Sequence, residues 1–207
     1  MNVQVAEPVQ TNAKPLTTPV GLSRIVIAGF MGAGKTTVGR LVAARLGWDF
    51  VDLDALIEAR AEMTVPAIFA DHGEAHFRRL ESNALAAVLG RPSLVLALGG
   101  GTPEVLTNRL LLEQTPATSV VFLDAPFPAL FDRCMLQALS AEPSGHSEEP
   151  LRPLLADADA AEARYHARQP LYRRLARVTV ATAALTPEQT ASTLLERLST
   201  TGSPSRR

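Results

Sequence analysis

The sequence has little of what marks secreted, membrane-spanning or nucleic-acid-binding proteins. Its 207 residues include a single cysteine, Cys134, which excludes an internal disulfide and is consistent with a reducing compartment. The net charge of −1 at pH 7 provides no global basic field to attract nucleic acid. No apolar run has membrane-spanning length, and the N-terminus lacks the pattern of a secretory signal. We therefore expect a cytoplasmic protein without nucleic-acid or membrane partners.

Apolar residues are plentiful, at 46% of the chain, and they are arranged in alternating strand-like and helix-like segments. The predicted strands lie at residues 24–29, 49–54, 93–98, 119–123 and 177–181. The clearest predicted helices lie at residues 34–46, 65–72, 74–89 and 187–198, the last with Thr186 as its N-cap. This alternation predicts an α/β fold with a parallel sheet covered on both faces. Ligands are then expected at the carboxyl edge of the strands.

The length fits one α/β domain, and composition suggests where that domain begins and ends. Residues 1–22 carry three prolines and no periodic pattern, so we expect a flexible leader. A single domain is predicted over residues 23–199, followed by a tail at 200–207. Within it, the polar, apolar-poor stretch around residues 140–150 predicts a mobile loop.

The most informative segment is GFMGAGKT at residues 29–36, which matches the phosphate-binding pattern G-x-x-x-x-G-K-[ST]. A β-branched run precedes it, and apolar residues then recur at helical spacing, namely Val38, Leu41, Val42 and Leu46. In that context the glycine-rich backbone and the helix N-terminus can hold phosphates. Lys35 can reach the β- and γ-phosphates, and the Thr36 hydroxyl can bind Mg²⁺. The alternative is a glycine-rich turn with an exposed lysine.

Two carboxylates follow the second predicted strand. Asp52 and Asp54 are two residues apart, so their side chains share one side if the strand continues through both. One could hold Mg²⁺, directly or through water, while the other binds an acceptor hydroxyl. Either could instead cap the next helix, and capping does not exclude the other role.

Three further features each have a functional and a structural interpretation. Arg78 and Arg79 could bind an anion or form a solvated ion-pair face with neighbouring glutamates. The three glycines at 99–101 indicate either a close approach of the backbone or a plain tight turn. Arg152 and Arg168 flank a helix beside the polar loop, so that loop could be a lid that delivers positive charge, or the arginines could be ordinary surface residues.

Together these segments resemble the shikimate kinases. The resemblance rests on GFMGAGKTTVGR at 29–40, FVDLD at 50–54, GEAHFRRLES at 73–82, LGGG at 98–101, and LRPLL at 151–155 with ARQPLY at 167–172. It implies a three-layer α/β/α fold of the P-loop kinase type, with a five-stranded parallel sheet in the order 2-3-1-4-5. It also implies a lid at about residues 134–151 and transfer of the γ-phosphate of ATP to the 3-hydroxyl of shikimate.

The resemblance also assigns residues, one position at a time. The implied ATP-binding residues are Gly32, Ala33, Gly34, Lys35, Thr36, Thr37, Arg133 and Arg152, with Arg133 against adenine and Arg152 on the lid. The implied shikimate-binding residues are Asp54, Arg78, Gly99, Gly100, Gly101 and Arg168. One Mg²⁺ is implied on Thr36 and, through water, Asp52. Lys35, Asp54 and Arg152 are the implied catalytic residues.

Two alternatives stay open at this point, and we expect a monomer under each. One is a P-loop kinase for another small hydroxylated acid such as gluconate, although the triple glycine and the R-P-L-L segment count against it. The other is a non-catalytic module that senses a shikimate-like ligand. Such modules usually carry an added domain, which a leader of 22 residues is too short to form.

Overall fold

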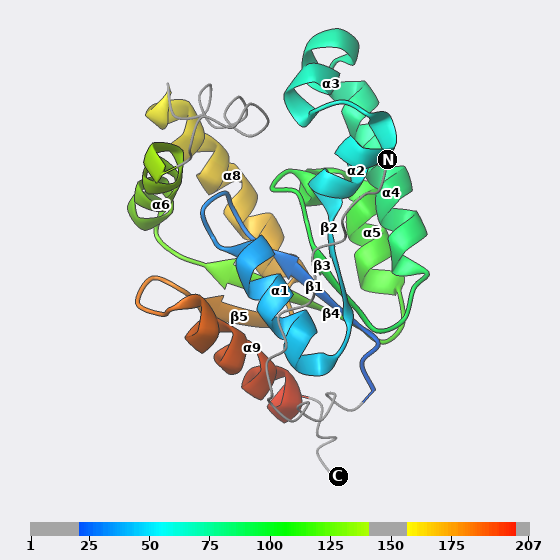
Figure 1. Ribbon diagram of the computed structural model, residues 1–207, viewed down its shortest axis with the longest axis vertical. Coiled ribbons are helices and arrows are strands. Elements are labelled where there is room, and N and C mark those ends of the chain that lie inside the picture. Colours follow the sequence, from blue (N-terminus) through cyan, green and yellow to red (C-terminus); the bar gives the residue numbers. More distant parts are fainter. Residues whose placement is uncertain (1–20, 141–156, 202–207) are drawn as a thin grey trace, which may run out of the picture.

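The computed structural model describes residues 21–140 and 157–201 (Figure 1). Five parallel strands form one sheet in the order β2-β3-β1-β4-β5, which confirms the predicted fold class and strand order. The strands are β1 Arg24–Ala28, β2 Asp49–Asp52, β3 Leu94–Ala97, β4 Thr118–Asp124 and β5 Val178–Ala181. Each lies within one or two residues of its predicted position.

Helices cover both faces of this sheet (Figure 1). The described helices are α1 Lys35–Leu46, α2 Leu53–Ala61, α3 Val65–His72, α4 Glu74–Leu89, α5 Leu106–Gln114, α6 Phe127–Ser140, α8 Ala158–Leu175 and α9 Pro187–Thr201, with a single 3₁₀ turn, η1, at Thr102–Glu104. Helices α1 and α9 pack on each other on one face, while α5 and α8 pack against β4. Among these described helices, none is long and apolar enough to cross a membrane.

The central strands are buried because both faces of the sheet are covered. In β1, Ile25, Val26 and Ile27 have no exposed surface, as a continuous apolar run in a parallel sheet predicts. The register pairs Ile27 with Ala97 of β3 and with Val121 of β4, so these strands end close to one another. The segments that follow them therefore meet at one edge, where the predicted site residues lie.

One predicted boundary is wrong, and it matters for the site. Strand β2 ends at Asp52 instead of continuing to residue 54, because Asp52 Oδ1 accepts hydrogen bonds from the backbone N–H groups of Asp54 and Ala55. These bonds cap α2, and the helix begins at once. Asp54 therefore lies in the first turn of a helix, and strand alternation does not relate its side chain to that of Asp52.

Other local signals are confirmed. Helices α3 and α4 have the predicted bounds, and Thr186 caps α9 through a reciprocal pair of hydrogen bonds with Gln189. Of the predicted lid, residues 134–140 continue helix α6, while residues 141–151 lie outside the described residues. Most of the predicted leader and tail lies outside them as well.

Candidate active site

The loop between β1 and α1 has the backbone of an anion-binding site. Gly32 and Gly34 have φ angles of +72° and +84°, in the left-handed region that favours glycine. A Cβ on Gly32 would also lie 2.4 Å from the carbonyl oxygen of Leu130. Gly34 is the N-cap of α1 and provides no side-chain hydrogen bond to it. The first N–H groups of the helix therefore lack a side-chain cap and can donate to a phosphate.

Lys35 follows immediately and is half-buried against the loop. Its Nζ donates a hydrogen bond to the carbonyl oxygen of Phe30 at 3.1 Å. Burial lowers the pKa of the Lys35 ammonium below its ordinary value, while the carboxylates of Asp54 and Asp52 act in the opposite direction. The lysine and these two acids therefore form one electrostatic unit at the carboxyl end of the sheet.

Asp52 combines a helix cap with a contact to the residue that follows the phosphate-loop lysine, and the sequence analysis left room for both. One carboxylate oxygen, Oδ1, caps α2, and the other, Oδ2, accepts a hydrogen bond from the Thr36 hydroxyl at 2.7 Å. The cap fixes the carboxylate, and the carboxylate in turn orients the hydroxyl at the start of α1. Capping and a role beside the phosphate loop are thus compatible in the same side chain.

Asp54 lies where carboxylates are crowded. Burial raises its pKa from 3.8 to about 6, with further increases from Asp52, Glu81 and Glu58 and an opposing effect from Lys35. Perturbed carboxyl groups of this kind are common at functional sites. Its value still leaves Asp54 mostly ionised at neutral pH, as a hydrogen-bond acceptor or base requires.

Asp54 lines a cavity of about 450 Å³ beside the phosphate loop. Helices α2, α3, α4 and α8 and the segment after β3 provide its walls. The lining residues are Asp54, Val65, Phe69, Glu74, Phe77, Arg78, Glu81, Gly99, Gly100, Gly101, Glu104, Arg164 and Arg168. The structure therefore brings all six predicted shikimate-binding residues into one cavity, including segments more than 100 residues apart.

Arg78 is held by two glutamates of its own helix, α4, and by one glutamate of η1. Its guanidinium pairs with Glu81 at 3.0 Å, with Glu74 at 3.0 Å and with Glu104 at 3.5 Å. Glu81 is fully buried and also accepts a 2.6 Å hydrogen bond from Thr102. Sequence reasoning noted Glu81 as a neighbour of Arg78 but missed its burial, and the available signal was an acid within the apolar stripe of α4.

Arg168 reaches the same place from α8. Its Nη2 donates to Glu104 at 2.9 Å, so Glu104 accepts from both arginines. The Arg168 Nε is buried and has no acceptor among the described residues. One helical turn further on, the Tyr172 hydroxyl donates a 2.6 Å hydrogen bond to the Gly100 carbonyl oxygen. Neither Glu104 nor Tyr172 was given a role from the sequence. Glu104 lies outside the quoted motifs, and Tyr172 ends the ARQPLY segment but meets Gly100 only through the packing of α8.

The triple glycine permits close approach. A Cβ on Gly99 would lie 2.6 Å from Asp54 Oδ1, and one on Gly101 would lie 2.4 Å from Arg78 Nη2. Neither glycine is among the described positions with positive φ. The glycines are thus needed for space around Asp54 and Arg78, which favours the close-approach interpretation over a plain tight turn.

A second cavity, of about 260 Å³, lies on the other side of the phosphate loop. Its lining residues are Gly32, Ala33, Gly34, Thr37, Val38, Arg133, Leu136, Gln137, Thr182, Leu185, Pro187 and Thr190. Arg133 from α6 donates to the carbonyl oxygen of Thr182 at 2.6 Å and to its hydroxyl at 3.2 Å, which links α6 to the segment after β5. The predicted lid arginine, Arg152, lies outside the described residues.

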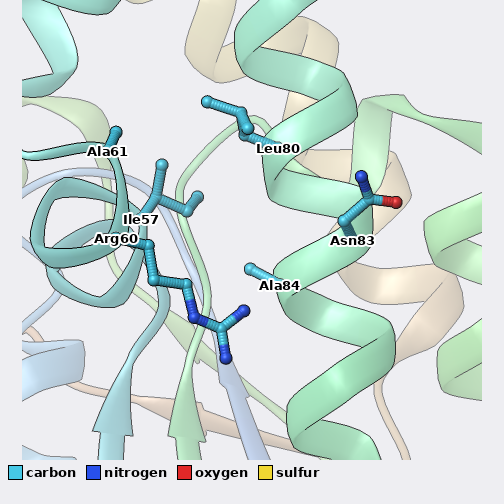
Figure 2. A pocket seen from close by; sticks show the side chains of 6 residues that line it. All are labelled: Ile57, Arg60, Ala61, Leu80, Asn83 and Ala84. Atoms are coloured by element: carbon cyan, nitrogen blue, oxygen red, sulfur yellow. The ribbon is translucent and has the colours of Figure 1, made fainter.

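A third and smaller cavity, of about 120 Å³, separates α2 from α4 (Figure 2). Ile57 and Leu80 point toward each other across it, and Arg60 is the one charged residue among the described residues that line it. It shares no lining residue with the cavity of Asp54. This is an apolar gap between two helices, without a cluster of reactive groups.

Comparison with known proteins identifies the family. The family model described as shikimate kinase matches residues 31–199. The chain belongs to the shikimate kinase family. The shikimate kinase of Symbiobacterium thermophilum is 39% identical over 178 residues, which cover 86% of this chain and 97% of that protein. The shikimate kinase of Bordetella avium is 40% identical over 164 residues, covering 78% and 72%.

Solved structures agree with this assignment. A shikimate kinase from Acinetobacter baumannii, in complex with shikimate, superposes with a TM-score of 0.74 at 34% identity, covering 87% of this chain and 94% of that one. The shikimate kinase of Bacteroides thetaiotaomicron gives 0.72 at 33% identity, covering 85% and 98%. The predicted family and activity are confirmed: this shikimate kinase family member is a phosphotransferase that uses ATP and acts on shikimate.

Proposed function

We propose that this chain transfers the γ-phosphoryl group of ATP to the 3-hydroxyl of shikimate, giving shikimate 3-phosphate and ADP. The observation that carries the proposal is the convergence of Arg78 and Arg168 on one side of a cavity that also holds Asp54. Two guanidinium groups suit a carboxylate, since their planar donors bind it in a bidentate manner. The buried Nε of Arg168, which has no acceptor among the described residues, adds a donor for such a group.

Asp54 is proposed to receive the reacting hydroxyl. It lies next to the phosphate loop and interacts electrostatically with Lys35, so a hydroxyl bound to it would face the transferring phosphoryl group. As the new O–P bond forms, the hydroxyl proton moves to an Asp54 carboxylate oxygen, and the bond from the γ-phosphorus to the ADP oxygen breaks. Positioning and charge neutralisation then supply most of the acceleration.

Lys35 and Arg152 are proposed to stabilise the negative charge on the transferring group. Lys35 follows the phosphate loop directly, and its Nζ must leave the Phe30 carbonyl oxygen to reach a γ-phosphate. Arg152, expected on a lid, would supply a second positive charge on the same phosphates. Charges in a site from which water is excluded act more strongly than the same charges in water.

The residues beside the loop fit a magnesium ion. Mg²⁺ prefers oxygen ligands, keeps several waters and is usually bound by few protein groups together with phosphates. The Thr36 hydroxyl and the Asp52 carboxylate, 2.7 Å apart, provide such a pair, with Thr36 as direct ligand and Asp52 acting through water. When bound, the ion would neutralise the β- and γ-phosphate oxygens and reduce their repulsion for the incoming hydroxyl.

The remaining assignments concern ATP and the protein as a whole. The backbone of residues 32–37 would hold the phosphates, and the cavity lined by Arg133 would take the nucleoside, with the guanidinium against adenine. We further propose that the protein is a cytoplasmic monomer. Gel filtration with light scattering tests the oligomeric state, and a mass of about twice the 22.1 kDa of one chain would overturn the monomer.

The direct test is ADP release by the purified protein with Mg-ATP, measured with shikimate, with gluconate and with neither. We expect strong stimulation by shikimate alone. Asp54→Ala or Arg78→Ala should abolish it while the circular dichroism spectrum stays that of the wild type. Near-normal turnover by either variant would contradict the assigned roles. ATP binding without any stimulation by shikimate would favour a different substrate or a sensor.

A further inference from the structure

Glu104 is the point at which the two arginines, Arg78 and Arg168, meet. Its Oε2 accepts from Arg168 Nη2 at 2.9 Å and from Arg78 Nη2 at 3.5 Å. These are the two guanidinium groups to which we assign the substrate carboxylate. A carboxylate of the protein thus already lies where the arginines would receive a carboxylate of the ligand.

The backbone of Glu104 is held in place by its neighbours. Its N–H donates to the Gly101 carbonyl oxygen at 2.9 Å, which closes the η1 turn. Arg109 donates to the carbonyl oxygens of Pro103 and Glu104 at 2.6 and 3.0 Å, and Asn108 donates to that of Thr102 at 3.1 Å. Freedom to move therefore resides in the side chain of Glu104, while its attachment point at the cavity is fixed.

The three glutamates around Arg78 differ in what they can do. Glu81 is fully buried and bound to Thr102, so it stays with Arg78 as a permanent counter-charge. Glu74 is 65% exposed and touches Arg78 but not Arg168. Glu104 is 37% exposed, lines the cavity and bridges both arginines. Among these three, Glu104 alone combines the bridging position with a route into solvent.

We propose that Glu104 is an internal competitor for the substrate carboxylate. In the free protein it keeps the two like-charged guanidinium groups together and satisfies part of their hydrogen-bonding capacity. Shikimate must displace it from Arg168 and from Arg78, so part of the binding free energy is spent on that exchange. The same carboxylate promotes release of the phosphorylated product, because it returns to the arginines as the product carboxylate leaves. This inference rests on the proposed function.

Glu104→Gln tests the competition, because it removes the charge and keeps the shape. We expect the KM for shikimate, and the Kd for shikimate without nucleotide, to fall about 3- to 10-fold. The ligand then no longer has to displace the charge-assisted contact of Glu104 with the arginines. The KM for ATP should change less than about 2-fold, since Glu104 does not line the cavity around Arg133 that we propose for the nucleotide. Asp49→Asn is the matched control, an acid in an exposed ion pair with Arg91 at the start of β2.

The outcomes separate this inference from the proposed function. Wild-type turnover with shikimate tests the function by itself. If that turnover is present but Glu104→Gln has an unchanged or higher KM for shikimate, the proposed competition is wrong. Glu104 then either orders the two arginines for binding or has no effect on shikimate binding. Glu104→Asp is the second variant, should the first fold poorly. It keeps the charge but shortens the reach, and we expect a smaller decrease in KM. An unchanged or higher value there would also overturn the proposal.

Discussion

The two cavities beside the phosphate loop are built in opposite ways. In the cavity around Arg133, which we propose for the nucleotide and call the nucleotide cavity, the described lining consists of backbone, apolar and neutral polar groups, with Arg133 as the one charged residue among them. In the cavity around Asp54, which we propose for the phosphoryl acceptor and call the acceptor cavity, more than half of the described lining residues are charged, and they come from α2, α4, α8 and η1. Phosphate can be held by N–H groups and a helix N-terminus within one short segment. A carboxylated, hydroxylated acceptor requires side chains brought together from distant segments.

This difference affects stability as well as recognition. In the nucleotide cavity Arg133 is satisfied by Thr182 and Gly32 and joins α6 to the β5–α9 connection. In the acceptor cavity burial raises the pKa of Asp54 to about 6, and the neighbouring carboxylates of Asp52, Glu81 and Glu58 add to that increase. Ionised Asp54 therefore lowers the stability of the folded protein at neutral pH, whereas the hydrogen bonds of Arg133 stabilise it. Functional sites commonly hold groups in such unfavourable surroundings.

The largest expected effect comes from removing the Lys35 ammonium, which lies at the phosphate loop and interacts electrostatically with Asp54 and Asp52. Lys35→Met should lower kcat by at least about 10³-fold, because stabilisation of the transferring group is lost. Shikimate binding without nucleotide should change little, since Lys35 does not line the acceptor cavity. Steady-state turnover and calorimetry of shikimate binding check this. Arg40→Met, an exposed position on the same helix, is the control. Near wild-type turnover would contradict the role of Lys35.

A smaller effect should separate the two cavities from each other. Arg78→Lys keeps the charge beside buried Glu81 but loses the planar pair of donors. We expect the KM for shikimate to rise about 10- to 100-fold, while the KM for ATP stays within about 2-fold. Arg79→Lys, at the next and exposed position of α4, should leave both constants unchanged. Equal increases in both KM values would show that the cavities are not independent.

The smallest effect concerns Asp54 and has opposite signs for activity and stability. Because its pKa is raised to about 6, the kcat/KM for shikimate should fall about 10-fold per pH unit below that value. The Asp54 carboxyl binds its proton more tightly in the folded state than in the unfolded state. The stability that this protonation contributes is therefore present below about pH 4 and is lost as pH rises through 6.

Asp54→Asn should therefore stabilise the free protein at pH 8 by about 1–2 kcal/mol, after allowance for the lost attraction to Lys35, with little gain at pH 4. Urea unfolding at the two pH values measures this. Asp49→Asn, which breaks an exposed ion pair, should change stability by about 0.5 kcal/mol or less at pH 8. Destabilisation by Asp54→Asn at pH 8 would contradict the crowding of charge around this group.

The loop between β1 and α1 could be located from the sequence because its motif consists of contiguous residues. Lys35 and Thr36 are fixed by their place in one motif, and β1 and α1 follow from local periodicity. A shared side for Asp52 and Asp54 was expected only if the strand continued through both. The stated alternative, a helix cap by one of them, is what the structure shows, with Asp52 as the cap of α2.

The acceptor cavity was predicted only where a motif marks it, as at Arg78. Glu81 occupies a core position of α4, and its burial depends on Thr102 lying opposite it in the fold. The bridge from Glu104 to Arg78 and Arg168 joins residues 26 and 64 positions apart. Helical periodicity contains no information on such contacts, since they depend on how α4, η1 and α8 pack together.

The most direct test of the account is a crystal structure with shikimate and ADP bound. We predict that the shikimate carboxylate lies between Arg78 and Arg168 in that complex. The 3-hydroxyl should lie within hydrogen-bonding distance of Asp54, on the side that faces the phosphate loop. A carboxylate bound elsewhere, or a 3-hydroxyl turned away from Asp54, would contradict the assignment of the two cavities.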